Sequence, residues 1–111
     1  MTTILPQDID GNPIPAIRLR DNGAHVINVT GTTARNSAAF DEDTRIVSLY
    51  ATEPVYIAFG GASIEATTSD HYFPAGTYYD FSIGGDKASH YTHVAALAVN
   101  TAGTLYISEK E

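Results

Sequence analysis

Three of the four histidines, His71, His90 and His93, are the residues best suited to metal binding or acid–base chemistry. His90 and His93 are three residues apart, a spacing that converges on one face of a helix but diverges in an extended strand. Asp70 directly precedes His71, and neighbours in an extended chain also point apart. Because the surrounding sequence indicates strands and turns, we predict surface or turn histidines and no metal site.

Other patterns associated with catalysis are incomplete. Ser63 lies in "GGASIE", which differs from the G-x-S-x-G turn of serine hydrolases. Residues 84–87, "GGDK", lack the spacing and the following Ser or Thr of a phosphate-binding loop. The acidic run 41–43 points its carboxylates in different directions, whereas a calcium loop spaces them to surround the ion. The chain has no cysteine. We therefore predict no catalytic residue, no cofactor and no enzymatic activity.

Composition limits the classes of partner. The chain has 111 residues, of which 43% are hydrophobic, as expected for one folded domain. The formal net charge is −7, and the six Lys and Arg residues are scattered. Nucleic acids and anionic membranes both require clustered positive charge, so we predict neither as a partner. The N-terminal sequence lacks the features of a signal peptide, and no stretch approaches the roughly 20 apolar residues of a membrane-spanning helix.

The element that is easiest to recognise covers residues 45–61, "RIVSLYATEPVYIAFGG". It reads as two strands that meet at a corner, residues 52–54. In each strand the apolar side chains recur every second residue, which places them on one face. The residues concerned are Val47, Leu49, Ala51, Val55, Ile57 and Phe59. We expect an antiparallel hairpin with one buried face, in which Ala51 lies opposite Val55.

The same alternation recurs in "AHVINVT", "YYDFSIGG" and "TLYISE". Their inward side chains are expected to be Ile27, Val29, Tyr79, Phe81, Ile83, Leu105 and Ile107. The stretch "THVAALAVN" is apolar on both faces, which indicates a central strand. Turn signals separate these runs at intervals of roughly 8–12 residues, a pattern typical of β-sandwiches and barrels. We predict an all-β fold, a single antiparallel β-sandwich of the jelly-roll-like kind with an extended N-terminal arm.

Two segments depart from the strand pattern. Residues 1–16 contain three prolines, which favour extended conformations, and we assign them to the arm; residues 17–111 form the sandwich domain. Residues 30–43 form a long polar loop with a lone Phe40, and loops of this length are often functional. We expect the arm and this loop to contact partners. The residues concerned are Ile4, Leu5, Ile14, Ile17, Arg18 and Phe40.

Tyrosine is abundant, with seven copies and no Trp. Tyr50, Tyr56, Tyr78 and Tyr106 have the parity expected of outward-facing strand positions. A surface tyrosine supplies a large contact area at low conformational cost, to a protein or to a sugar ring. The alternative is that tyrosine simply suits strands. We predict that these four tyrosines contribute to an interface.

Several motifs together are similar to a family of small virion-associated proteins of tailed bacteriophages and prophages. They are "DGNPIPAIRL", "NSAAF", "TRIVSLYATEPVYIAFGG", "ATTSDHYFPAGTYYDFSIGGDK", "HVAALAV" and "GTLYISE", and they cover most of the chain. The resemblance implies a β-structure protein of the virion that is not an enzyme, and it brings no catalytic residues with it.

From the resemblance and the composition we expect a decoration or cement protein that stabilises the phage head through subunit contacts. Its expected location is the virion, after synthesis in the cytoplasm of the bacterial host. Its expected partners are the major capsid protein or other virion proteins, and copies of itself, with a trimer favoured. Two alternatives remain open. One is a tail, baseplate or fibre component that binds host-surface glycans through tyrosines, and the other is a cupin-like metal enzyme that uses His71, His90 and His93.

Overall fold

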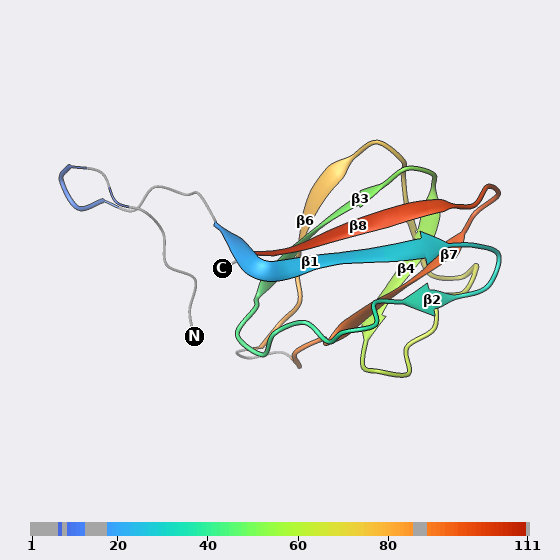
Figure 1. Ribbon diagram of the computed structural model, residues 1–111, viewed down its shortest axis with the longest axis horizontal. Coiled ribbons are helices and arrows are strands. Elements are labelled where there is room, and N and C mark those ends of the chain that lie inside the picture. The colour runs from blue at the N-terminus through green and yellow to red at the C-terminus, as the bar shows by residue number, and fades with distance from the viewer. Residues whose placement is uncertain (1–6, 8, 13–17, 86–88, 111) are drawn as a thin grey trace.

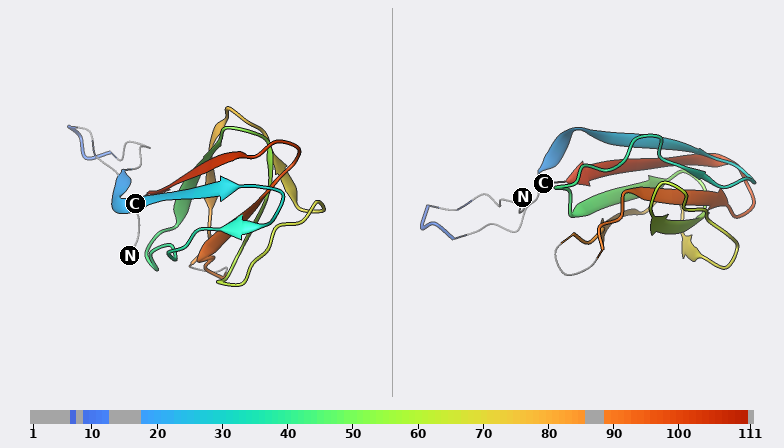
Figure 2. Two further views of the ribbon diagram at one scale, coloured as in Figure 1. Left: turned by 45° about the vertical axis from the view of Figure 1, so that its right-hand side comes forward. Right: turned by 90° about the horizontal axis from the view of Figure 1, so that it is seen from below.

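The computed structural model describes residues 7, 9–12, 18–85 and 89–110. Their regular structure is entirely β, and Figures 1 and 2 show two sheets packed as separate layers. The strands are β1 Leu19–Val29, β2 Ala34–Arg35, β3 Ile46–Ala51, β4 Val55–Gly60, β5 His71–Phe73, β6 Tyr78–Ser82, β7 His93–Ala98 and β8 Gly103–Lys110. Within the described ranges, no helix has the length and apolar character needed to span a membrane.

The strand order is that of a jelly roll. One antiparallel sheet has the order β1-β8-β3-β6, and the other has the order β2-β7-β4-β5. Six of the seven connections cross from one sheet to the other, and only β4 to β5 remains within a sheet. Eight strands in this order form the two interlocked Greek keys of that fold. The prediction of a single antiparallel, jelly-roll-like sandwich is confirmed.

The predicted pairing of the segment 45–61 is wrong. β3 pairs with β6 and β8, whereas β4 pairs with β5 and β7, so the two strands do not form a hairpin. The corner between them carries the chain from one sheet to the other, and the Thr52 amide donates to the Thr104 carbonyl there (3.0 Å). The predicted set of inward-facing residues is nevertheless correct. Two strands that face each other across a core bury every second residue, as do the two strands of a hairpin with one buried face. Leu49 and Val55 are fully buried.

The core fills the space between the two sheets. It contains Ile27, Val29, Phe40, Val47, Leu49, Ala51, Val55, Ile57, Phe73, Ile83, Val94, Ala96, Leu105 and Ile107. β7 lies between β2 and β4, and its first four residues are buried, so the prediction of a central strand is confirmed. Burial of these side chains is the main term that stabilises the fold.

A buried carboxylate holds the loop before β3 against the sheet. Glu109 is 4% exposed, and its carboxylate accepts hydrogen bonds from the Thr44 hydroxyl (2.6 Å) and the Asp41 amide (2.8 Å). Its other oxygen lies 2.7 Å from His25 Nε2, and the His25 ring packs edge-on against Phe40. Phe40 itself is 3% exposed. The expectation that Phe40 contacts a partner is therefore wrong, because the side chain anchors its polar loop to the core.

Most of the predicted arm cannot be compared with the structure. Ile4, Leu5, Ile14 and Ile17 lie outside the described residues, and the boundary between arm and domain stays a prediction. The described arm residues, 7 and 9–12, are all exposed, and Ile9 is 100% exposed. Arg18, just before β1, is also exposed.

Candidate functional site

Four large side chains form a row across the outer face of the β1-β8-β3-β6 sheet. Val26 pairs with Tyr106, Tyr106 with Tyr50, and Tyr50 with Tyr78, so the row crosses all four strands at one register. Adjacent strands lie about 4.8 Å apart, which gives the row a length of about 15 Å. We call this set, Val26, Tyr106, Tyr50 and Tyr78, the tyrosine row.

The exposure of the tyrosine row is unusual for a sheet face. The four side chains are 60%, 48%, 36% and 56% exposed, in the order in which they cross the sheet. The alternate residues of the same strands, such as Leu49 and Ile107, point inward and are buried. An outer face of an antiparallel sheet normally carries polar residues, and a contiguous apolar patch on it marks an interaction site. The tyrosine row is therefore the candidate functional surface of this domain.

A polar cluster lies beside the row, with Ser48 and Asp80 two residues and Lys110 four residues along their strands from it. The Ser48 hydroxyl donates a hydrogen bond to the Asp80 carboxylate, and Lys110 Nζ lies 2.9 Å from Asp80 Oδ1. Lys110 Nζ also lies 5.2 Å from the centre of the Tyr78 ring, within cation–π range. The hydrogen bond from Ser48, and then the one from Lys110, hold the pKa of Asp80 below its usual value. Ser48 is 1% exposed, so this cluster offers no accessible nucleophile and instead fixes one border of the row.

The structure brings together three of the four predicted tyrosines. Tyr50, Tyr78 and Tyr106 share the row, and their predicted outward orientation is confirmed. Tyr56 does not belong to this surface, because β4 lies in the other sheet, where the ring is half-buried and packs edge-on against Tyr72 (6.4 Å between centres). Val26 was missed, although the inward parity of its neighbours in β1 already placed it outward.

The three histidines considered for a metal site are placed differently. His90 Nε2 lies 2.8 Å from the Thr44 carbonyl oxygen, His93 is buried in β7, and His71 is exposed in β5. Across the part of the chain that the structure describes, no three His, Cys, Asp or Glu side chains are grouped so that they could hold a metal ion.

The environment of His93 disfavours its charged form. Burial lowers the pKa of His93 below its ordinary value of 6.5, and the nearby charges of Arg35 and His25 lower it further. Its ring Nδ1 lies 2.8 Å from the Thr92 hydroxyl. His93 is therefore a buried residue with a hydrogen-bond partner rather than an exposed ligand.

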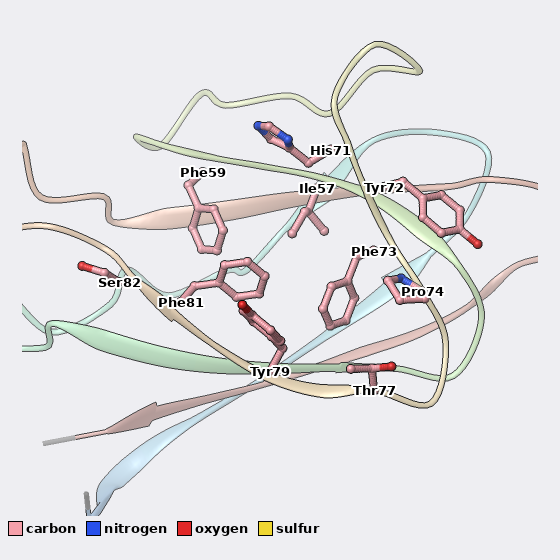
Figure 3. Close-up of a pocket in the computed structure, with 10 residues that line it drawn as sticks. All are labelled: Ile57, Phe59, His71, Tyr72, Phe73, Pro74, Thr77, Tyr79, Phe81 and Ser82. Carbon is pink, nitrogen blue, oxygen red and sulfur yellow. The ribbon is translucent and has the colours of Figure 1, made fainter. Parts of the chain in front are cut away.

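A second surface feature is a pocket of about 640 Å³ where the two sheets open between β5 and β6 (Figure 3). Its described lining residues are Ile57, Phe59, His71, Tyr72, Phe73, Pro74, Thr77, Tyr79, Phe81 and Ser82. In Figure 3 the rings of Phe59, Phe73, Tyr79 and Phe81 gather in the middle of the opening, whereas the Tyr72 hydroxyl points away from it. The pocket and the tyrosine row are separate surfaces, because Tyr79 lies on the inner face of β6 and Tyr78 on the outer face.

No family model and no curated protein matches the chain. Among solved structures, the chain is similar to one described as "Bacillus endospore appendages form a novel family of disulfide-linked pili". The two are 17% identical, with a TM-score of 0.45, over 78% of this chain and 80% of that one. At this level the likeness carries no argument about function.

Proposed function

We propose that this protein is a non-enzymatic structural subunit that docks onto other proteins through the tyrosine row, as a decoration or cement protein on the head of a tailed phage. The single observation that supports docking is the row itself, an exposed aromatic stripe at one register across a rigid sheet. The phage setting is supported by the resemblance of the sequence motifs. The partners are the major capsid protein or another virion protein.

The row has the properties of an interface centre. Tyrosine is enriched at interface hot spots because its ring buries a large apolar area while its hydroxyl can still find a hydrogen-bond partner. The strands below the row are anchored in the core, so little conformational entropy is lost when the rings are covered. Many copies on a symmetric lattice would each bury such a row, and together they would oppose separation of the capsid subunits.

A protein partner is favoured over a glycan by the state of the neighbouring polar groups. Specific small-ligand sites rely on precisely placed polar groups to fix orientation. Beside the row, the polar groups of Ser48, Asp80 and Lys110 already bind one another. A flat aromatic stripe with a satisfied polar border suits an extended protein surface better than a single sugar.

The experiment is a binding assay on purified phage particles assembled without this protein. The test variant is Tyr50→Ser/Tyr106→Ser, and the matched control is Tyr91→Ser, a 41% exposed tyrosine that is neither in the row nor among the described lining residues of the pocket. Loss of hot-spot tyrosines weakens binding by about thirtyfold or more. We expect that loss for the test variant and wild-type binding for the control.

Two results would count against the proposal. If the test variant coats the particles at wild-type occupancy, the row is not the docking surface. If the wild-type protein ignores particles but gives a glycan-array signal that the test variant loses, the row is a sugar platform, and the alternative of a host-glycan-binding tail, baseplate or fibre component is preferred.

A further inference from the structure

The sandwich is incompletely closed between β5 and β6. Leu49 pairs with Tyr79 and Val47 with Phe81, so Tyr79 and Phe81 share the inner face with these two buried residues. Tyr79 is nevertheless 57% exposed. The cause is the length of the opposing strand: β5 has three residues, whereas β6 has five. Part of the inner face of β6 therefore lacks a covering layer, and the pocket lies there (Figure 3).

The pocket is lined mainly by aromatic side chains, like a part of the core that no opposing layer covers. Phe81 lies at its centre, with ring centres 5.1 Å from Tyr79, 5.6 Å from Phe59 and 5.9 Å from Phe73. Among the described lining residues none is Asp, Glu, Lys, Arg, Asn or Gln. The polar side-chain groups of the described lining are the hydroxyls of Tyr, Thr and Ser and the His71 ring, so this lining has no carboxylate, Lys or Arg with which to pair a charge. Its aromatic lining instead suits aliphatic and prolyl side chains, as in grooves that bind proline-containing segments.

Within the described structure, the two strands that border the pocket have free edges, which suit the binding of an extended peptide segment. β5 and β6 are the edge strands of their sheets, so each presents one row of backbone groups without a neighbouring strand in the described structure. An extended peptide can add hydrogen bonds along such an edge while alternate side chains enter a pocket. Gly76, in the left-handed region (φ 76°), turns the chain between β5 and β6.

The N-terminal sequence contains a segment that matches this pocket. Residues 3–6, "TILP", combine two aliphatic side chains with a proline and carry no charge. The described residues that follow, 7 and 9–12, are exposed, and residues 9–12 lie outside the sandwich in Figure 1. Pro6 and Leu19 are thirteen residue steps apart, a span that reaches at most about 45 Å in a fully extended chain, and the turn at the described residues 9–12 shortens it. The described part of this segment extends away from the sandwich, toward the space that a neighbouring copy would occupy (Figure 1).

We propose that the segment Ile4-Leu5-Pro6 of one copy inserts into the β5–β6 pocket of a second copy and completes its core. Such a contact joins two different surfaces of the same chain, so it builds a ring when the rotation between copies closes. The inference concerns self-assembly and does not require the tyrosine row, which remains free for another partner.

The test uses four full-length proteins and measures oligomer mass against concentration by sedimentation velocity. They are the wild type, an arm variant (Ile4→Ser/Leu5→Ser), a pocket variant (Tyr79→Ser) and a control (Tyr106→Ser) on the row. We expect the wild type and the control to oligomerise alike. Each of the other two should dissociate, with a dissociation constant raised at least about tenfold by the lost apolar contacts. Thr77→Trp, which blocks the mouth from an exposed position, should repeat the effect of the pocket variant.

A mixing experiment distinguishes arm exchange from other kinds of interface. The arm variant retains an intact pocket, and the pocket variant retains an intact arm. Mixed at equal concentration, they should form a one-to-one heterodimer that grows no further. The proposal is overturned if the mixture stays monomeric or if the arm variant oligomerises like the wild type. It is also overturned if the wild type is a monomer at every concentration, which is the result expected when each arm occupies the pocket of its own chain. None of these outcomes bears on particle docking through the tyrosine row.

Discussion

Removal of the Glu109 carboxylate should detach the loop before β3 and strongly lower the stability of the domain. Glu109 joins β8 to β1 through His25, and to the loop through the Asp41 amide and the Thr44 hydroxyl. That loop in turn carries Phe40 into the core. Glu109→Ala therefore leaves buried donors without an acceptor, whereas Glu109→Gln keeps the shape of the side chain but removes its charge.

The magnitude follows from the three contacts. Hydrogen bonds to a charged group contribute about 1.5–3 kcal/mol each, against about 0.5–1.5 kcal/mol for neutral pairs. Glu109→Gln should thus lower the free energy of unfolding by about 2 kcal/mol. Glu109→Ala should lower it by about 4 kcal/mol, within the range for breaking a buried pair. For a domain of this size, each kcal/mol corresponds to about 4 °C in Tm, so the alanine variant should melt about 15 °C lower.

Urea unfolding followed by circular dichroism measures these changes. Glu65→Gln is the matched control, because Glu65 is exposed, and it should change the free energy of unfolding by less than about 0.5 kcal/mol. The reasoning would be refuted if Glu109→Gln and Glu65→Gln unfolded at the same urea concentration. Such a result would mean that the free-energy cost of desolvating the buried carboxylate is as large as the stabilisation that its three contacts provide.

Three further predictions concern the framework that positions the two surfaces. Leu49→Ala, at a fully buried site, should lower the free energy of unfolding by about 3 kcal/mol in the same urea assay. Gly103→Ala should cost about 1–2 kcal/mol because the new Cβ would lie 2.8 Å from Thr52 Oγ1, whereas Gly31→Ala, with open space around it, should keep the wild-type urea midpoint. Because burial lowers the pKa of His93 below 6.5, the unfolded chain binds a proton that the folded chain does not, and stability should fall as the pH drops below 6.5. His93→Gln should reduce that slope in unfolding curves measured at successive pH values, and an unchanged slope would contradict the assignment.

The fold class was predictable because alternation is a local property of the sequence. Leu49 and Ile57 point inward whichever strands they pair with, so their parity sufficed to place them in a core. The pairing partners were not predictable, since β3 bonds to β8, which lies more than fifty residues further along the chain. A corner without glycine, such as residues 52–54, suits a crossing between sheets as well as a hairpin.

The candidate site was predictable only in part, for the same reason. Parity pointed Tyr50 and Tyr106 outward, but only the register between distant strands places them side by side. The apolar Phe40 in a polar loop predicts a contact with a partner protein. In the structure its ring is instead buried and packs against His25. Tyr79 has inward parity, yet no local signal reveals that β5 is too short to cover it.

The central claim, that the tyrosine row docks onto a virion protein, is tested most directly by cryo-electron microscopy of phage particles that carry this protein. The account predicts density for the domain on the head, with Tyr50 and Tyr106 buried against a neighbouring protein. A reconstruction in which the outer face of the β1-β8-β3-β6 sheet points to solvent, or in which the domain is absent from the particle, would contradict it.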